Sequence, residues 1–410
     1  MSEIAQAPHS SPDGKIPQLR FPEFNDNWEE QKVGSFMVER NKKSPKSEAF
    51  PLMSFVARKG VTEKGKRYNR EFLVNDEGGK KYKQTEYGDF IYSSNNLETG
   101  SIGLNKYGAA TISPVYSIFQ ITDTCNYEFV SSSLVTKIFI HKMVRFRQGV
   151  VYGQWRIHES DFLKIQVELP SLEEQTKIAS FLSSIDSKIE QLSKKQALLG
   201  EYKKGLMQQI FSQAIRFQAD DGCDFPDWKE RRLEEVANFQ RGKNILEDKL
   251  GDKLLLGMGS VTEKGNLLIN KNTSEQYITL LKNDLVMPER DIGRGLIIGR
   301  VALIGQSDKY VLGANILSLT INSDNSSRFL FQIINENNFR KKVRKIVSGS
   351  AQLMITSKDA KKLALRLPVI EEQQQIANFL SSIDNKIEQV GKQLDESKQF
   401  KKALLQQMFV

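Results

Sequence analysis

Residues 168–186 read ELPSLEEQTKIASFLSSID, and residues 366–384 repeat this stretch as RLPVIEEQQQIANFLSSID. The prolines Pro170 and Pro368 are 198 positions apart, and the six residues FLSSID are identical in both copies. An internal repeat indicates that one structural unit has been built more than once from the same chain. We therefore interpret the sequence as two consecutive copies of one unit.

The repeat extends outward from this stretch over most of the chain. FPEFNDNW, which ends at Trp28, matches DGCDFPDW, which ends at Trp228. Between these matches the copies diverge, as YGDFIYSSNNLETGSIGL at 87–104 against LKNDLVMPERDIGRGLIIGR at 281–300 shows. Similar folds are therefore expected to carry different surface chemistry.

The first part of each copy, residues 17–170 and 222–368, has short apolar runs separated by Gly, Asn, Asp and Ser turns. Runs such as 90–92 and 316–321 predict short strands. We expect a mixed, strand-rich globule in each copy, which makes the fold class α+β. Residues 1–16 lack an apolar core and are expected to form a disordered lead-in.

The second part of each copy, residues 171–213 and 369–410, has a heptad pattern with alternating spacings of four and three. About 40 residues make a helix of roughly 60 Å. Ser171 and Glu174 have the spacing of a capping box that starts the first helix. The predicted seam is Ile178, Leu182, Ile185, Ile189, Leu192, Gln196, Leu199, Lys203, Leu206 and Ile210 in the first helix, and Ile376, Leu380, Ile383, Ile387, Val390, Leu394, Ser397, Lys401, Leu404 and Met408 in the second.

A seam of this length needs a partner helix, and the nearest candidate is the other copy. The linker from Phe211 to Phe225 is short, and compact domains usually keep their termini close together, so the second helix should run back along the first. This predicts an antiparallel coiled coil with a pseudo-twofold axis, a globular domain at each end and Val410 near the first domain. Parallel pairing between two chains is the alternative. Lys203 and Lys401, at the same repeat position, are expected to fix the register.

The composition is that of a basic protein. With 59 Lys and Arg against 50 Asp and Glu, the net charge of +9 favours an acidic partner such as nucleic acid. Cys125 and Cys223 lack metal-ligand spacing, which argues against a zinc site or a disulfide framework and fits a reducing cytoplasm. No apolar run reaches the roughly 18 residues that a membrane span needs. We therefore expect a cytoplasmic protein with no membrane partner.

Motifs that carry chemistry are missing from the sequence. It has neither the Asn/Asp-Pro-Pro-Tyr/Phe tetrapeptide of adenine methylation nor a GxxxxGK[ST] loop for ATP. His9, His141 and His158 are scattered and complete no acid-base or nucleophile set. We expect no catalytic residue, metal or cofactor in this chain.

The duplicated order of a variable globule followed by a PxxEEQxxIAxFLxxID helix resembles the specificity subunit of Type I restriction-modification systems. The resemblance covers essentially the whole chain after Leu19. It rests on the two helix motifs, on the openings that end at Trp28 and Trp228, and on the QxxI pairs at 154–157 and 352–355.

This resemblance implies that the protein is a non-catalytic, DNA-binding subunit. Each globule would be a target recognition domain that reads one half of a bipartite, asymmetric site in double-stranded DNA. The helices would set the separation of the half-sites and dock two adenine methyltransferase (modification) subunits. Two restriction/translocase subunits would join the complex, and S-adenosylmethionine, ATP and Mg would be bound in these partner subunits.

Recognition of bases and phosphates requires Arg, Lys, Asn and Gln on accessible loops, and the best candidates fall where the copies diverge. For each residue taken alone, an ordinary solvated side chain is the alternative. A third cluster, residues 340–345, is expected to form one helix face that contacts phosphates, with Arg145 and Arg147 as its counterpart. The candidates are Arg58, Lys59, Lys64, Lys66, Arg67, Ser94, Asn95 and Asn96 in the first globule, Arg241, Lys243, Lys264, Arg290 and Arg294 in the second, and Arg340, Lys341, Lys342, Arg344 and Lys345 in the third cluster.

Two other functions compete with DNA recognition at this point. A stand-alone coiled-coil scaffold predicts no salt-sensitive DNA affinity, whereas a DNA reader loses affinity as salt rises. A self-sufficient methyltransferase or nuclease is the third hypothesis, and the missing motifs argue against it. Spacing alone leaves open whether Glu173, Glu174, Glu371 and Glu372 are exposed for a methyltransferase subunit, because helix capping explains them equally well.

Overall fold

The chain divides into two compact units in the computed structural model. Unit 1 comprises residues 1–193 and 392–410, and unit 2 comprises residues 194–391. Each unit contains a part of both long helices. The model describes residues 5–6, 16–63, 80–149, 155–293, 295–349 and 352–410.

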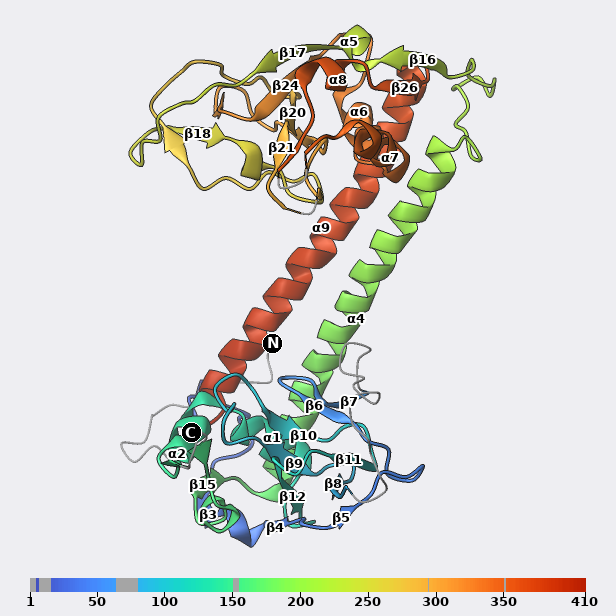
Figure 1. The fold of residues 1–410 in the computed structure, drawn as a ribbon. Helices are drawn as coiled ribbons and strands as arrows, with labels where there is room; N and C mark the ends of the chain where they lie inside the picture. The colour runs from blue at the N-terminus through green and yellow to red at the C-terminus, as the bar shows by residue number, and fades with distance from the viewer. Residues whose placement is uncertain (1–4, 7–15, 64–79, 150–154, 294, 350–351) are drawn as a thin grey trace. The chain divides into compact units, whose positions relative to one another are not determined.

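Unit 1 mixes short strands with short helices (Figure 1). Its described helices are η1 (Val33–Ser35), α1 (Tyr127–Leu134), α2 (Lys137–Val144), α3 (Glu159–Phe162), the first part of α4 (Leu172–Phe211) and the last part of α9 (Ile370–Gln407). Its described strands are β1 (Ala5–Gln6), β2 (Leu19–Arg20), β3 (Glu29–Lys32), β4 (Met37–Glu39), β5 (Lys43–Ser44), β6 (Ser54–Val56), β7 (Gly60–Thr62), β8 (Tyr82–Thr85), β9 (Phe90–Tyr92), β10 (Ile102–Leu104), β11 (Ala110–Ile112), β12 (Ser117–Ile121), β13 (Gln148–Gly149), β14 (Trp155–Arg156) and β15 (Gln166–Leu169). Two antiparallel sheets, with the orders β10-β9-β12-β4 and β11-β8-β5, form its centre.

Unit 2 has the same mixture of elements. Its described helices are the last part of α4, α5 (Leu233–Val236), η5 (Met258–Ser260), α6 (Ser327–Ile334), α7 (Asn337–Ile346), α8 (Ser357–Lys361) and the first part of α9 (Ile370–Gln407). Its described strands are β16 (Lys229–Arg232), β17 (Ala237–Arg241), β18 (Lys253–Leu256), β19 (Asn272–Thr273), β20 (Leu285–Pro288), β21 (Arg290–Asp291), β22 (Ala302–Leu303), β23 (Tyr310–Leu312), β24 (Ile316–Ile321), β25 (Leu353–Met354) and β26 (Ala364–Leu367). The larger sheet has the order β17-β24-β20-β22, and the smaller has the order β19-β18-β23.

The larger sheet is the same in both units, because β10, β9, β12 and β4 correspond in order and position to β22, β20, β24 and β17. We call this sheet, together with α1 or α6, the frame of each unit. The pairings around the smaller sheets recur as well: β11 pairs antiparallel with β8 and bridges Leu52 in parallel, while β23 bridges Thr279 antiparallel and pairs in parallel with β18. The predicted α+β fold with an internal repeat is therefore confirmed.

Equivalent aromatic residues fill the two cores. Trp28 packs edge-on against Phe129 of α1, with ring centroids 5.8 Å apart, and Trp228 packs on Phe329 of α6 at 5.9 Å. All four side chains are buried, so each tryptophan joins its opening segment to the frame. Such offset or edge-on pairs stabilise a core beyond their buried area alone.

Each core is completed by the end of a long helix. In unit 1, Phe409 lies 5.4 Å from Phe129, and Met408 and Phe409 are buried. In unit 2, Phe211 at the end of α4 lies 5.8 Å from Phe329. The end of the chain therefore belongs to the first unit, which confirms the predicted return of the second helix.

The two helices pair in an antiparallel direction within unit 2. Lys203 of α4 contacts Asp384 of α9, and a Cβ at Gly391 would lie 2.7 Å from the side chain of Gln196. As the residue number rises along α4, its partner's number falls along α9. Every predicted seam position of both helices is buried or half-buried, while most positions between them are exposed.

The seam lysines are neutralised by the aspartates that end the FLSSID repeats. Lys203 Nζ lies 2.7 and 2.8 Å from the carboxylate of Asp384 and 3.0 Å from Oε1 of Gln332. In unit 1, Lys401 Nζ lies 2.5 Å from Oδ1 of Asp186. Each unit thus holds one lysine and one aspartate from different helices in contact, and this contact selects a single register.

Removing the aspartate is expected to cost more than removing both charges. Asp384→Ala should lower the free energy of unfolding by about 1–2 kcal/mol, because it leaves the half-buried ammonium of Lys203 without its carboxylate. The double variant Lys203→Met with Asp384→Ala should recover most of this loss, since methionine fills the seam without a charge. Urea unfolding followed by circular dichroism measures both values. A double variant no more stable than Asp384→Ala would show that the ion pair is not the reason for the loss.

The lead-in differs from its prediction where it is described. Ala5–Gln6 form β1, which pairs antiparallel with β2, so these two residues are not the disordered segment that the sequence predicts. Their backbone groups have partners that a composition argument does not foresee. Residues 1–4 and 7–15 of the lead-in lie outside the described residues.

Candidate nucleic-acid interface

The second glutamate of the first EEQ motif is buried in an ion pair. Glu174, which is 1% exposed, accepts hydrogen bonds from Nε and Nη2 of Arg20, both at 2.7 Å, and from Nε1 of Trp28 at 3.4 Å. Its backbone N–H donates to Oγ of Ser171, as in a capping box. The predicted capping box is wrong in its second half, because Arg20 takes the carboxylate that would return to Ser171. Glu173, by contrast, is exposed.

The second EEQ motif has the same arrangement. Glu372 is fully buried, and it accepts hydrogen bonds from Nη2 of Arg216 at 2.8 Å and from Nε1 of Trp228 at 3.2 Å. Glu371 is exposed. Glu174 and Glu372 therefore anchor the opening segments to the long helices. Of the four glutamates, only Glu173 and Glu371 are accessible.

The glutamine of each motif connects two helix starts. Gln175 donates to the carbonyl of Pro170 at 2.9 Å and accepts from the N–H of Asn126 at 3.0 Å. Gln373 makes the equivalent contacts with Pro368 and with the N–H of Ser326. Asn126 and Ser326 cap α1 and α6. The EEQ motif thus belongs to the fold, and the recognition residues have to be sought elsewhere.

Two candidate cations of unit 1 lie at the tip of a hairpin. Arg58 and Lys59 form the turn between β6 and β7, and both are exposed. The turn is held by a hydrogen bond from the N–H of Arg58 to the carbonyl of Gly100 at 2.9 Å. Gly100 has a φ of +93°, and a Cβ there would lie 2.7 Å from Cγ of Arg58. Lys64, Lys66 and Arg67 lie outside the described residues.

Ser94 and Asn95 hold a neighbouring segment in place. Oγ of Ser94 accepts from the N–H of Ile157 at 3.0 Å, and Oδ1 of Asn95 accepts from the N–H of Trp155 at 2.6 Å. These contacts position Trp155 and Arg156, which are both exposed. Trp155 and Arg156 are candidates that the sequence reading missed, although an aromatic residue beside an arginine is a signal for nucleic-acid contact. Asn96 is also exposed.

In unit 2, two of the candidates flank one buried carboxylate. Arg241, at the end of β17, donates through Nε to Glu289 at 2.8 Å, and Arg290 follows directly in the chain. Arg290 is half-buried, with Nη1 3.5 Å from Oε1 of Gln352. Arg241 keeps 61% of its side chain exposed, so it can still reach a ligand.

The remaining candidates of unit 2 are separate from this pair. Lys243 lies over the ring of Tyr277, 3.5 Å from its centroid, in a cation–π contact. Lys264 is exposed in a tight turn that is closed by a hydrogen bond from Gly265 to Thr262. Arg294 lies outside the described residues.

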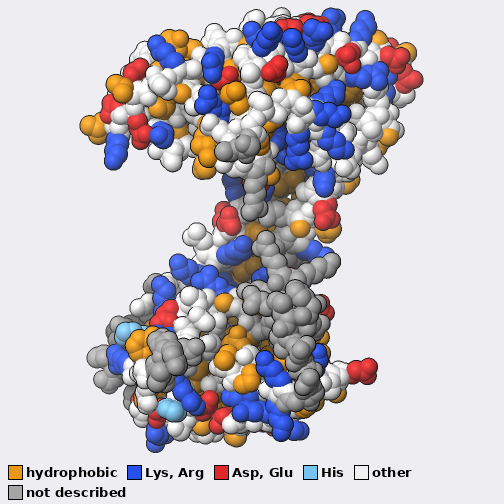
Figure 2. Space-filling model, in the orientation of Figure 1, with side chains coloured by type: hydrophobic (Ala, Val, Ile, Leu, Met, Phe, Trp, Pro, Cys, Tyr) orange, Lys and Arg blue, Asp and Glu red, His pale blue; other side chains and the backbone are white. Residues whose placement is uncertain are grey.

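The third cluster does not form one face of a helix. It lies on α7, where Arg340 is 4% exposed and points into the unit, while Lys342 donates to the carbonyl of Ala364. Lys341, Arg344 and Lys345 are exposed. The prediction is wrong for Arg340, because one turn of α7 has to cover the core with Val343 and this places Arg340 inside as well. Figure 2 shows further Lys and Arg side chains over the face of unit 2 that is in view.

Of the two arginines proposed as the counterpart of this cluster in unit 1, only Arg145 is free to contact a phosphate. Arg147 donates to both carboxylate oxygens of Glu98, at 2.6 and 2.7 Å, and its hydrogen bonds lower the pKa of Glu98. A bidentate pair of this kind occupies the guanidinium, so we correct the expectation that Arg147 is a free phosphate contact. Arg145 is exposed.

The described residues contain no group of three or more His, Cys, Asp or Glu side chains that could hold a metal ion. Cys125 is buried and Cys223 is exposed, and both are free thiols. Within the described part of the chain, no helix is both long and apolar enough to cross a membrane.

A family model matches both copies of the repeat. The model of the Type I restriction modification DNA specificity domain matches residues 25–199 and again residues 226–397. The chain is also 25% identical over 414 residues to the Type I restriction enzyme MjaVIII specificity subunit of Methanocaldococcus jannaschii. That alignment covers 94% of this chain and 92% of the relative.

Solved structures share the fold over nearly the whole chain. The S subunit of a Type-I restriction-modification system from M. genitalium aligns with a TM-score of 0.63 and 16% identity, covering 96% of this chain and 99% of that one. A chain from a structure that describes complex assembly and conformational transition of the type I R-M system aligns with a TM-score of 0.55 and 16% identity, covering 92% and 96%. Both alignments therefore include the two units and both long helices.

Proposed function

This chain belongs to the family of the Type I restriction modification DNA specificity domain, and we propose that it reads a bipartite, asymmetric sequence in double-stranded DNA. In this proposal each unit recognises one half-site, and α4 and α9 set the separation between the half-sites. The chain itself is a non-catalytic subunit of a methyltransferase and endonuclease complex.

The observation that carries the proposal is one frame with two different sets of exposed side chains. The contacts of Trp28 and Glu174 recur at Trp228 and Glu372. The exposed candidates do not recur: unit 1 has a hairpin with Arg58 at its tip where unit 2 has η5. Two readers that share a backbone but differ in their polar side chains suit two different half-sites, because base edges are distinguished by side-chain hydrogen bonds.

Two methyltransferase subunits and two restriction/translocase subunits complete the proposed complex. These partners would bind S-adenosylmethionine, ATP and Mg, and they would supply the chemistry. Part of the outer face of α4 supports a role in docking a partner: Leu198 and Tyr202, one turn apart, are 54% and 56% exposed. Exposed large apolar side chains that neighbour each other are typical of protein interfaces.

The proposed function is tested by co-expressing the chain with a cognate methyltransferase subunit and mapping N6-methyladenine across the host genome. We expect one split motif with a fixed gap, methylated only when this chain is present. The methyltransferase subunit alone is the control, because it lacks a reader. A soluble, assembled complex that adds no methylation would contradict the proposal and would favour a scaffold.

A further inference from the structure

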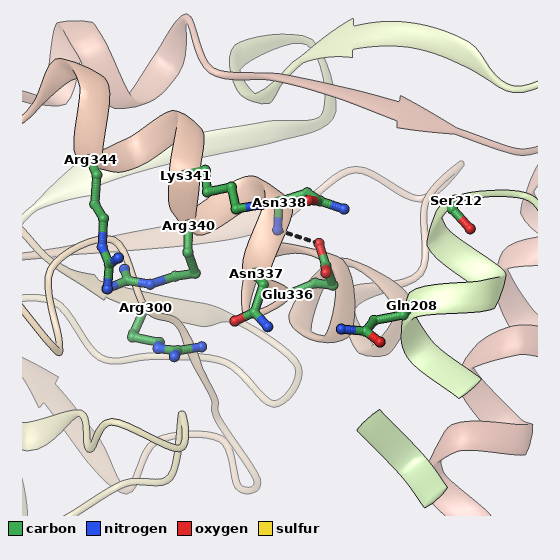
Figure 3. A pocket seen from close by; sticks show the side chains of 9 residues that line it. All are labelled: Gln208, Ser212, Arg300, Glu336, Asn337, Asn338, Arg340, Lys341 and Arg344. Atoms are coloured by element: carbon green, nitrogen blue, oxygen red, sulfur yellow. Dashed lines mark hydrogen bonds between the residues drawn. The ribbon is translucent and has the colours of Figure 1, made fainter. Parts of the chain in front are cut away.

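One cavity of unit 2 is lined by an unusual number of cations. It has a volume of about 510 Å³ and lies between α7, the end of α4 and the loop before β22. Arg300, Arg340, Lys341 and Arg344 line it together, as Figure 3 shows. Glu336 is the acidic residue of the lining, and its carboxylate accepts from the N–H of Asn338 at the start of α7. It is therefore already used as a helix cap.

Arg340 builds the wall of this cavity. Its guanidinium donates to the carbonyls of Ile298, Gly295 and Leu296, at 3.1 Å for Gly295 and 3.2 Å for Leu296, and it is buried. These bonds fasten the loop that leads to Arg300 against α7. Arg340 is thus a positioning residue that contributes its charge but has its hydrogen-bond donors largely occupied.

Arg300 retains an unused donor. Its Nη1 donates to the carbonyl of Asn335 at 2.5 Å, but its buried Nε has no hydrogen-bond partner among the described residues. A buried polar group without a partner costs free energy, so natural proteins seldom keep one unless a ligand or water completes it. Arg344 is exposed and forms no ion pair within the described part of the chain.

The three guanidinium groups repel one another. Figure 3 shows those of Arg340 and Arg344 pointing toward each other. Burial, together with the charges of Arg300 and Arg344, lowers the pKa of Arg340 to about 10, and burial and Arg344 lower the pKa of Arg300. The charges of Asp291 near Arg340 and Glu263 near Arg300 act in the opposite direction. A bound anion would relieve the remaining repulsion.

The shared frame does not require this cluster. The helix α2 occupies the place of α7 in unit 1, and it has Ile140 and Val144 where α7 has Arg340 and Arg344. Because unit 1 folds without these cations, the cluster serves something that only unit 2 does. A ligand of unit 2 is the direct explanation.

We propose that this cavity binds one phosphate of the DNA backbone, held by the guanidinium groups of Arg300 and Arg344, with Lys341 also in its lining. The inference rests on the proposed DNA-reading function. Arginine suits this role because its planar fork of donors matches phosphate oxygens. The contact fixes the position of unit 2 on the duplex and carries no base specificity. Arg300, which the sequence reading missed, becomes a DNA-positioning residue.

The test compares the full-length chain, in complex with its methyltransferase subunit, with the variant Arg300→Gln/Arg344→Gln. DNA affinity is measured at several salt concentrations on a duplex that contains the methylated motif. We expect affinity to fall about tenfold and the slope of log K against log salt to decrease in magnitude by about 1, because one phosphate contact is lost. The methylated motif should stay the same. Arg344→Gln alone changes an exposed residue and should not disturb the fold. It should lower the DNA affinity and the salt slope in the same direction as the double variant.

Arg328→Gln is the matched control, since Arg328 is an exposed arginine of α6 that does not line the cavity. If the slope of the double variant equals that of Arg328→Gln, the phosphate site is wrong while the DNA-reading function stands. If the unmodified complex itself shows no salt-sensitive DNA binding, the proposed function fails and the inference fails with it. A further outcome is that inorganic phosphate binds the unmodified chain and fails to bind Arg300→Gln while the salt slope for DNA stays the same. That outcome would assign the cavity to a free anion and overturn the proposal.

Discussion

Glu174→Ala is expected to lower the free energy of unfolding by about 3–5 kcal/mol. The substitution removes the carboxylate but leaves the guanidinium of Arg20 buried, at 7% exposure, together with the indole N–H of Trp28. A buried charge without its partner is much less stable than the intact pair. Glu372→Ala should have a similar effect in unit 2, where Arg216 and Trp228 lose the same partner.

The neighbouring glutamates are built-in controls for this prediction. Glu173→Ala and Glu371→Ala change exposed residues of the same motif, so each should alter stability by no more than about 0.5 kcal/mol. Urea unfolding gives the magnitudes, and hydrogen exchange of peptides from each unit localises the loss to unit 1 for Glu174→Ala. Equal effects of Glu173→Ala and Glu174→Ala would mean that the buried pair does not anchor the unit.

Exchanging the reader of unit 2 is expected to change one half of the methylated sequence and leave the other half unchanged. The segment to replace is residues 233–363, taken from a family member with a known site. This choice retains the β16 and β26 pair as well as Trp228 and Glu372, which join the unit to its helices. Each half-site should then change only when the unit that reads it is exchanged, because specificity depends on the side chains that reach base edges.

The exchange is read out by mapping N6-methyladenine with a cognate methyltransferase subunit. The reciprocal exchange in unit 1, between β3 and β15, is the matched control and should change the opposite half-site. The gap between the halves should be the same in all three proteins, since α4 and α9 are unchanged. A simultaneous change in both halves would contradict the independence of the two readers.

The long helices could be predicted from sequence because their pattern is local and repeated. Apolar residues at spacings of three and four predict a helix and its buried face at once. The repeat adds the partner, since each seam has its counterpart 198 positions away. Lys203 and Lys401 indicate the register from sequence alone, but only the structure identifies their partners, Asp384 and Asp186 respectively.

The anchors of the two units were harder to foresee. Arg20 and Arg216 perform the same task, but the first precedes its tryptophan by eight residues and the second by twelve. A comparison of the repeats therefore does not align them. The burial of Arg340 was missed for a related reason, because a run of cations in sequence indicates a solvated face, and only the packing of α7 shows which of them turns inward.

Base-reading residues were the least predictable part. The candidates lie where the copies diverge, and divergence marks where the surface chemistry differs without specifying the role of each side chain. In the structure, Ser94 and Asn95 hold backbone in place, whereas Trp155 and Arg156 beside them are presented to solvent. Whether a polar side chain supports a loop or faces a ligand depends on contacts between distant segments. Local sequence patterns do not predict such contacts.

The EEQ anchors also bear on how such a chain can evolve. Arg20, Trp28, Glu174 and Gln175 fasten unit 1 at its two borders, and none of them lies in the stretch where the copies diverge. Mutations in the interior loops can therefore accumulate without touching the contacts that close the unit. The contacts that close the unit and the exposed side chains of its loops belong to different residues, so a lineage can change its target through the exposed loop positions while the closing contacts are retained.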